Sequence, residues 1–366
     1  MATSVAVIGT GLMGGSLAMA LQRHPDVGGV TVYDSSPSVR EKASELPGCV
    51  VAGDIHSAVD GADIVFIATP AGSVVDVFTS ISGSTKAGAI VSDLASAKSR
   101  ITSAIDSLES SRASFVGGHP MTGSEQSGIE AARPELYEDC YYILTPTDGT
   151  DPSALEALHR FLTKLGARVI TLDPESHDRA MAAVSHVPHL VAQLLMDMAS
   201  RERERTKSVF KLAAGGFRDM TRIAASDTGL WIDICEENSD FIAARLRELS
   251  SDMSDLADAV ESGDSAVLSE KFERARRERL ELSTRGPRDP GDMFELRIAV
   301  PDEPGVISRI TTAAGAAGVN IEDIGLVHPL EGEQGILTLR VKGEEQAGLA
   351  AGAADSLGYR ASIRGV

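Results

Sequence analysis

The chain has 366 residues, enough for two or three domains, and 43% of them are hydrophobic, as is ordinary for a globular protein. Its 34 basic and 53 acidic residues give a formal net charge of −19, which argues against nucleic-acid binding because a polyanion requires a basic face. No apolar run approaches the roughly 18 residues that cross a bilayer. No basic stretch followed by an apolar core marks an export signal. The three widely spaced cysteines fit neither a disulfide framework nor a zinc cluster, so we expect a cytoplasmic protein.

A glycine-rich segment near the chain start lies between a predicted strand, Ser4 to Ile8, and a helical pattern. It has the form G-x-G-x-x-G, in which glycines allow a tight turn and a close approach of a pyrophosphate to the helix start. The sequence therefore predicts a dinucleotide-binding fingerprint made of Gly9, Thr10, Gly11, Leu12, Met13 and Gly14.

The next predicted strand, residues 30–33, ends in Asp34, about 20 residues beyond the last fingerprint glycine. A carboxylate at this spacing binds ribose hydroxyls, which favours NAD. Ser35, Ser36 and Arg40 suit a 2'-phosphate, so NADP stays open. The other interpretation of Asp34 is a turn residue before Pro37.

Further strands are predicted at residues 63–68, 89–92, 114–116, 141–144 and 168–171, separated by helical or polar stretches. This alternation is typical of a mostly parallel, doubly wound sheet. Strand ends in such a sheet converge on the cofactor, so we count Thr69, Pro70 and Asp93 as cofactor-binding candidates.

The segment FVGGHPMTGSE, residues 115–125, places His119 just past a predicted strand, inside a glycine-rich loop. At the carboxyl edge of the sheet, His119 is predicted to share a pocket with Ser96 and Lys98. Its position alone leaves two interpretations open, a catalytic base or a loop residue.

From about Pro174 helical periodicity replaces the strands. Ser185, His186 and His189 lie in a long helical pattern, which Pro188 is expected to kink. No third ligand stands at a telling spacing from the two histidines, so no metal site is predicted. Further on, Gly215 begins a segment with Arg218 and Arg222, and a guanidinium can hold a carboxylate through two parallel hydrogen bonds.

A proline- and glycine-rich linker, Arg285 to Gly291, precedes the last segment. From Met293 the pattern predicts β-α-β-β-α-β, the ferredoxin-like split unit, in about 75 residues. This segment has no cluster of ionisable residues suited to catalysis, so we expect it to bind a ligand or to assemble.

Three motifs that follow the fingerprint in order, GHPMTGSE, SHVPH and GGFRDMTRIAASD, carry a resemblance to a known family. The chain resembles the prephenate/arogenate dehydrogenase family of tyrosine biosynthesis, with a C-terminal ACT domain. The resemblance implies an α/β Rossmann-type domain at 1–172 and an all-α substrate and dimerisation domain at 173–285. A linker at 286–292 and a ferredoxin-like ACT domain at 293–366 would complete the chain.

The resemblance implies oxidative decarboxylation of prephenate to 4-hydroxyphenylpyruvate with NAD, or of arogenate to tyrosine with NAD or NADP. His119 would be the catalytic histidine, hydrogen-bonded to the ring hydroxyl, and Ser96 would orient both. Ala95 departs from the family pattern, which often has glycine before this serine. The residues expected around the substrate are His189 and Arg222 at its carboxylate side chain, Ser185 and His186 as helpers, and Glu125 and Asp219 at the rim.

The ACT-like segment resembles modules that bind amino acids. We expect tyrosine as a feedback effector, with candidate contacts at Asp302, Pro304, Gly305 and Asn320. The alternative is a purely structural dimerisation module. A homodimer is expected in either case from the family.

Two other functions compete with this prediction. A 3-hydroxyacid dehydrogenase has a similar layout but relies on a lysine from a helix of its second domain, where this chain offers histidines and arginine. A catalytically silent, amino-acid-sensing protein that uses NAD only structurally is the remoter alternative.

Overall fold

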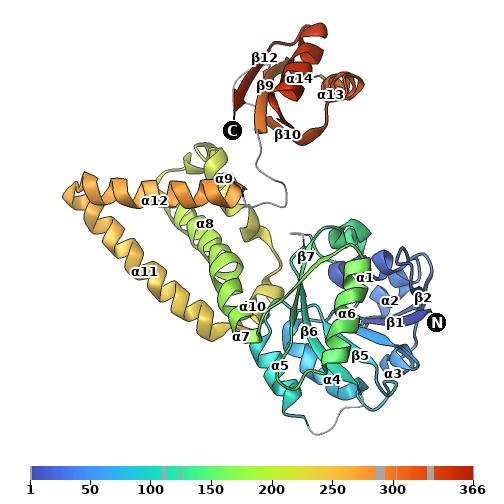
Figure 1. The fold of residues 1–366 in the computed structure, drawn as a ribbon. Coiled ribbons are helices and arrows are strands. Elements are labelled where there is room, and N and C mark those ends of the chain that lie inside the picture. Colours follow the sequence, from blue (N-terminus) through green and yellow to red (C-terminus); the bar gives the residue numbers. More distant parts are fainter. Residues whose placement is uncertain are drawn as a thin grey trace. The chain divides into compact units, whose positions relative to one another are not determined.

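The structure is a computed structural model that describes residues 2–108, 113–123, 126–284, 293–301, 303–327 and 334–365. The predicted linker, 286–292, lies outside these residues. The chain divides into two compact units, Met1–Ser254 and Asp255–Val366, which are described one at a time (Figure 1).

The first unit contains an eight-stranded sheet in the order β3-β2-β1-β4-β5-β6-β7-β8. Neighbouring strands are parallel except β6 and β7, which are antiparallel. The predicted mostly parallel, doubly wound sheet is confirmed, with one short strand, β3, that was not predicted. The strands are β1 (Thr3–Ile8), β2 (Val27–Tyr33), β3 (Cys49–Val51), β4 (Ile64–Ile67), β5 (Ile90–Asp93), β6 (Ser114–Pro120), β7 (Tyr141–Thr145) and β8 (Arg168–Thr171).

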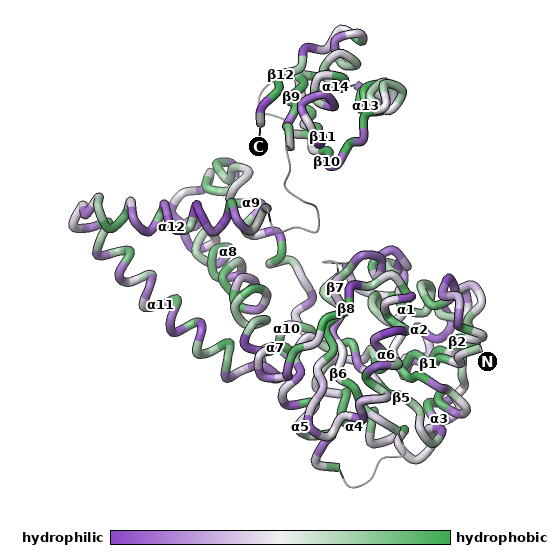
Figure 2. Tube along the Cα trace, in the orientation of Figure 1, coloured by the Kyte–Doolittle hydropathy of each residue, from purple (hydrophilic) through white to green (hydrophobic). Residues whose placement is uncertain are grey.

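Helices cover both faces of this sheet, and β1 shows why. Its side chains alternate between faces, so Val5 and Val7 pack into one apolar cluster while Ala6 and Ile8 pack into another. Figure 2 shows the strands as mainly hydrophobic, as expected for a sheet buried on both sides. The flanking helices are α1 (Leu12–Leu21), α2 (Pro37–Ala43), α3 (Ile55–Val59), α4 (Val74–Ile81), α5 (Ser99–Asp106) and α6 (Pro152–Lys164).

Strand β6 is longer than predicted and contains His119, which pairs with Ile143 of β7. The prediction that His119 lies in a loop was therefore wrong. Two glycines let the strand continue, because a Cβ on Gly117 would lie 2.3 Å from Thr145 Oγ1 and one on Gly118 would lie 2.7 Å from Asp93 O. Without side chains at these positions, β6 stays extended between its two neighbours and carries His119 with it.

Helices follow β8 in the first unit, as predicted. The expected irregularity near Pro188 is a π-helical turn at Ala182–His186. Proline lacks an N–H, and its ring clashes with the carbonyl four residues earlier, that of Val184, so the helix widens there. The elements are α7 (Pro174–Met181), α8 (Val187–Arg205), α9 (Gly215–Thr221), the 3₁₀ turn η6 (Arg222–Ala225), α10 (Thr228–Glu237) and α11 (Ser239–Ser262), which runs across the boundary of the two units.

The second unit contains a four-stranded antiparallel sheet in the order β10-β11-β9-β12. Alternate residues of β9, Leu296, Ile298 and Val300, are buried against apolar residues of α13 and α14. No helix in the described ranges combines the length and apolar character needed to cross a membrane. The elements are α12 (Ser265–Thr284), β9 (Met293–Pro301), α13 (Val306–Ala316), β10 (Ile321–Val327), β11 (Gln334–Lys342), α14 (Glu344–Ser356) and β12 (Ala361–Gly365).

Candidate active site

The carboxyl ends of β1, β2, β4 and β5 meet at one edge of the first sheet because these strands are parallel. Strands β1 and β4 are neighbours there, and the chain leaves them in opposite directions along the sheet. Ligands of doubly wound folds bind at this switch point. The glycine-rich loop follows β1, and Thr69 follows β4, so both lie at this edge.

The three fingerprint glycines differ in what surrounds them. Gly9 has φ +94°, and a Cβ there would lie 2.5 Å from Ala68 O, while a Cβ on Gly14 would lie 1.9 Å from Gly9 O. These two glycines are needed for the turn and for close packing. Gly11 has open space around it, and α1 begins at the next residue, Leu12, with no acidic side chain in its first turn. The backbone at Gly11 therefore fits a pyrophosphate at the helix start.

Asp34 is fixed beside this loop. Its carboxylate accepts hydrogen bonds from the backbone N–H groups of Thr10, at 2.8 Å, and Ser36, at 2.9 Å. The guanidinium of Arg40 donates to the backbone carbonyls of Asp34 and Ser35, at 2.6 and 3.1 Å. A carboxylate here suits ribose hydroxyls and repels a 2'-phosphate, so the residues present fit NAD.

Thr69, at the end of β4, has a buried hydroxyl with no hydrogen-bond partner among the described residues. A bound ligand at this edge would give that hydroxyl a partner. Pro70, next in the chain, is exposed. Both residues therefore lie just after β4, at the same sheet edge as the glycine-rich loop.

Asp93 lies deeper than the sequence suggested. It is fully buried, and its carboxylate accepts hydrogen bonds from the backbone N–H groups of Ala95 and Gly118, at 3.0 and 3.1 Å. It also pairs with the ammonium of Lys98, which donates to the Gly118 carbonyl at 2.9 Å. Burial lowers the pKa of Lys98, and Asp93 opposes that shift. These two side chains are thus engaged with each other and with the backbone beside His119.

His119 is 9% exposed, and its Nδ1 lies 2.8 Å from Nε2 of His177 on α7. Nδ1 of His177 lies in turn 2.8 Å from a carboxylate oxygen of Asp178. Burial is the main cause that holds the pKa of His119 well below its ordinary value, and the like charges that His177, Lys98 and His186 carry when protonated act in the same direction. A histidine with this pKa is neutral at pH 7 and able to accept a proton.

Neither His177 nor Asp178 was singled out from the sequence. The only local signal was a His–Asp pair at the start of a predicted helix. The partner of that pair, His119, lies 58 residues earlier in the chain, so no local pattern connects them.

A second group of side chains gathers around the π-helical turn, the start of α8, and α10 with its C-terminal cap. The His189 ring stacks on Trp231 with centroids 3.4 Å apart, and His186 meets the same indole edge-on at 6.1 Å. Asn238 donates to the backbone carbonyl of Asp178 at 2.9 Å and lies 3.0 Å from His186 Nδ1. Burial lowers the pKa of His189, and it lowers the pKa of His186 to about 4. Both histidines are therefore neutral hydrogen-bonding groups at pH 7.

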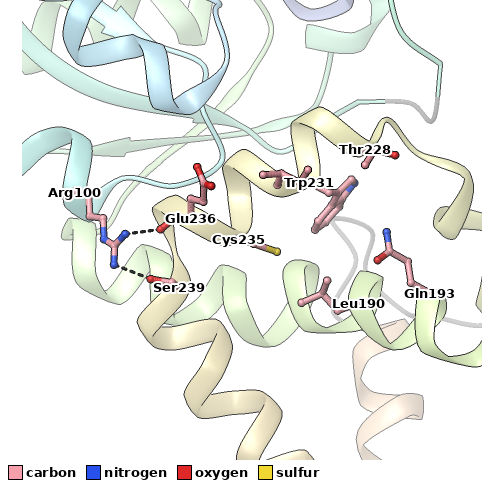
Figure 3. Close-up of a pocket in the computed structure, with 9 residues that line it drawn as sticks. Arg100, Leu190, Gln193, Thr228, Trp231, Cys235, Glu236 and Ser239 are labelled. Carbon is pink, nitrogen blue, oxygen red and sulfur yellow. Dashed lines mark hydrogen bonds between the residues drawn. The ribbon is translucent and has the colours of Figure 1, made fainter.

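A pocket of about 520 Å³ opens beside Trp231 (Figure 3). Leu190 and Gln193 of α8 lie along one side of it, and α10 contributes Trp231 and Cys235. The side-chain nitrogen of Gln193 lies 3.2 Å from His189 Nε2, so the pocket adjoins the ring stack. Arg100 closes one end by donating to Ser239 Oγ at 2.7 Å. The remaining lining residues are Thr228, Ile232 and Glu236.

The other predicted site residues lie around these two groups. Ser96 is half-buried in the loop between β5 and α5, and Ser185 is half-buried in the π-helical turn. Asp219 on α9 and Arg222 on η6 are exposed, on segments that pack against α8. Glu125 lies outside the described residues. Within the described ranges, no group of three or more histidine, cysteine or acidic residues could hold a metal ion.

Comparisons with known proteins identify the family. Residues 17–171 match the family model described as "Prephenate dehydrogenase, nucleotide-binding domain", and residues 173–274 match "Prephenate dehydrogenase, dimerization domain". A prephenate dehydrogenase of Bacillus subtilis is 33% identical over 349 residues, which are 94% of each chain. The chain belongs to the prephenate dehydrogenase family. This family consists of NAD-dependent oxidoreductases, and the resemblance to the family is confirmed for the nucleotide-binding and dimerization domains.

Solved structures agree with this assignment. The prephenate dehydrogenase of A. aeolicus, in complex with hydroxyphenyl propionate and NAD+, is 31% identical with a TM-score of 0.72, covering 77% of this chain and 99% of the other. The arogenate dehydrogenase of Synechocystis is 28% identical with a TM-score of 0.66, covering 76% of this chain and all of the other.

The buried Asp93–Lys98 pair yields a stability prediction. Lys98→Met leaves Asp93 buried without a counter-charge and is expected to lower the free energy of unfolding by about 3–5 kcal/mol. Lys86→Met, which removes an exposed pair with Asp63, is the matched control and should cost about 0–1 kcal/mol. Urea unfolding followed by circular dichroism measures both, and equal losses would contradict the role given to the buried pair.

Proposed function

We propose that this member of the prephenate dehydrogenase family oxidises and decarboxylates prephenate to 4-hydroxyphenylpyruvate, with NAD as the oxidant. The observation that carries the proposal is His119, a buried neutral histidine at the same sheet edge as a glycine loop that fits NAD. The two relatives named for prephenate, at 31% and 33% identity, support this substrate.

In this reaction His119 accepts one proton, that of the substrate's hydroxyl. As hydride leaves the carbinol carbon of the substrate, the hydroxyl proton moves to the ring nitrogen of His119 that faces the substrate, Nε2. Bound NAD supplies the hydride acceptor. The bond to the ring carboxylate then breaks, carbon dioxide departs, and its electron pair makes the ring aromatic. The same oxygen regains a proton as the phenol forms, so His119 ends as it began.

Other residues bind and orient the substrate in this proposal. Ser96 orients the hydroxyl toward His119. His189, supported by Ser185 and His186, donates a hydrogen bond to the side-chain carboxylate, because a neutral imidazole can bind an anion only in this way. Arg222 supplies the local positive charge that an anionic substrate needs on a chain of net charge −19.

We also infer a homodimer built from the helical segment, residues 173–285. The family model that matches residues 173–274 is described as a dimerization domain. Helix α8 of this segment leaves Leu194 59% exposed and Met198 54% exposed, and a second copy would cover such side chains. The other inferred domains are the nucleotide-binding domain, 1–172, and the regulatory domain, 293–366, after the linker 286–292.

The regulatory proposal is that residues 293–366 form an ACT domain that binds tyrosine. The β-α-β-β-α-β order and the antiparallel sheet support the ferredoxin-like fold. A pocket of about 710 Å³ lies at the start of α13, lined by Pro304, Gly305 and Ser308 among others. Asn320 is bonded to Glu322 and Gln346, and Asp302 lies outside the described residues.

Turnover assays test the proposed activity directly. Prephenate and arogenate, each with NAD or NADP, are mixed with the whole protein while reduced nicotinamide is followed by its near-ultraviolet absorbance. Prephenate with NAD should be turned over fastest, because Asp34 disfavours a 2'-phosphate. Turnover of arogenate alone would reassign the substrate, and no turnover with any pair would refute the dehydrogenase.

The variant His119→Asn tests the base. We expect kcat to fall by roughly 10²–10⁴-fold while the Kd for NAD stays unchanged, because asparagine accepts no proton. In the unmodified protein a base works only when unprotonated, so activity should persist below pH 6.5 and fall only as pH passes the lowered pKa of His119. If NAD binding fell as much as turnover, His119 would be a structural residue instead.

Tyrosine binding has its own test. Saturating tyrosine should lower turnover and raise the Tm, since a ligand at 100 times its Kd stabilises the folded state by about 2.7 kcal/mol. Ser308→Glu places a carboxylate inside the pocket and should abolish both effects, whereas Thr312→Glu, exposed on the same helix outside the pocket lining, should keep them. Unchanged activity and Tm in the unmodified protein would refute tyrosine as the effector.

A further inference from the structure

Three buried side chains form a continuous hydrogen-bonded row from strand β6 to helix α7. His119 Nδ1 meets His177 Nε2 at 2.8 Å, and His177 Nδ1 meets Asp178 Oδ1 at 2.8 Å. His177 is fully buried and Asp178 is 1% exposed. The row therefore connects the proposed base to a carboxylate that solvent does not reach.

The protonation state of Asp178 can be read from its partners. Besides His177, its carboxylate accepts hydrogen bonds from the backbone N–H groups of Lys98 and Ser99, both at 2.8 Å. Burial alone would raise the pKa of Asp178, but the hydrogen bonds from His177, Ser99 and Lys98 together hold it below the ordinary value. Asp178 is thus an anion, which only accepts hydrogen bonds.

The anion decides where each proton in the row lies. Since Asp178 only accepts, Nδ1 of His177 carries a hydrogen. In a neutral His177, which has one N–H, Nε2 is then bare and accepts. His119 must then carry its hydrogen on Nδ1, and its Nε2 is left as a lone pair. Nε2 is the nitrogen that must receive the substrate's proton.

The opposite arrangement would disable the base. If His177 donated to His119 from Nε2, the hydrogen of neutral His119 would lie on Nε2 and face the substrate, where it could not accept a proton. The other charged or titratable groups near His119 do not choose between its tautomers. Lys98 is paired with Asp93, and His186 is hydrogen-bonded to Asn238.

We propose that His177 and Asp178 are positioning residues that hold His119 in the tautomer with its hydrogen on Nδ1 and stabilise the imidazolium that forms during turnover. This rests on the proposed function, in which His119 is the base. When Nε2 takes the hydroxyl proton, Nδ1–H still donates to His177, whose far side faces the Asp178 anion. The positive charge is therefore compensated until the phenol oxygen regains its proton.

The competing explanation is that the row only ties α7 to the sheet. Both accounts predict lost stability when His177 is replaced, so the test needs readouts that a structural role would not change. These are the tautomer of His119, the pH profile of kcat, and the separation of kcat from KM.

Ring-nitrogen NMR of isotope-labelled histidine in the whole protein at neutral pH reads the tautomer without any turnover. The spectra of His119→Asn and His177→Phe assign the two signals. We expect His119 to carry its hydrogen on Nδ1, with a bare Nε2. A hydrogen on Nε2 would overturn the proposal, whatever the activity.

Kinetics test the consequence. His177→Phe removes the acceptor, and we expect kcat to fall by roughly 10²–10⁴-fold with KM unchanged. The acid limb of kcat should move to lower pH, because the imidazolium of His119 loses its stabilising partner. His177→Gln, whose amide oxygen can accept from His119 Nδ1, should restore part of kcat.

His24→Phe is the matched control, because His24 is also buried and bonded, to the Phe161 carbonyl at 3.0 Å, but makes no contact with the row. It should lower the Tm and leave kcat and the pH profile unchanged. A folded His177→Phe with normal kcat, or a pH profile that does not move, would overturn the proposal. If the unmodified protein turned over neither prephenate nor arogenate, the proposed function would fail while the NMR result still decided the tautomer.

Discussion

The site depends on one constraint, the burial of the Asp93 and Asp178 carboxylates near His119. Asp93 and Asp178 are both removed from water, which is costly unless every charge is matched by a partner. Lys98 matches both, since its ammonium pairs with Asp93 and its backbone N–H donates to Asp178. Because its ammonium also holds the Gly118 carbonyl, this one residue fixes β5, β6 and α7 against each other beside His119.

The remaining geometry follows from that arrangement. With β6 held this close to β5 at Gly118 and to β7 at Gly117, only glycine fits at these two positions, so the strand arrives at His119 without turning. The histidine then points toward α7 from a backbone that is hydrogen-bonded to β7. A strand holds a side chain more rigidly than a loop does, and a base that must meet a hydroxyl at hydrogen-bond distance needs that rigidity.

Local patterns in the sequence predicted most of the fold of the first unit and the sheet edge at which the candidate residues lie. The fingerprint glycines, Asp34 and the apolar strands each express a constraint within a few residues, so they can be read directly. Three features could not be read in this way. The sequence does not show that His177 contacts His119 or that Trp231 stacks on His189. It also does not show that Asp93 lies against the extended part of β6. Each depends on residues that folding brings together from distant parts of the chain.

The hydrogen bonds of His177 and Asp178 also show that the site does not lie within the nucleotide-binding domain alone. A nucleotide-binding domain that ended at residue 172 would contain the glycine loop, Asp34 and His119, yet it would lack the two residues that orient the histidine. The smallest fragment with a correctly prepared base extends into α7, beyond the junction of the two family domains. Recombination at that junction would separate His119 from the two residues proposed to orient it, because both lie on α7.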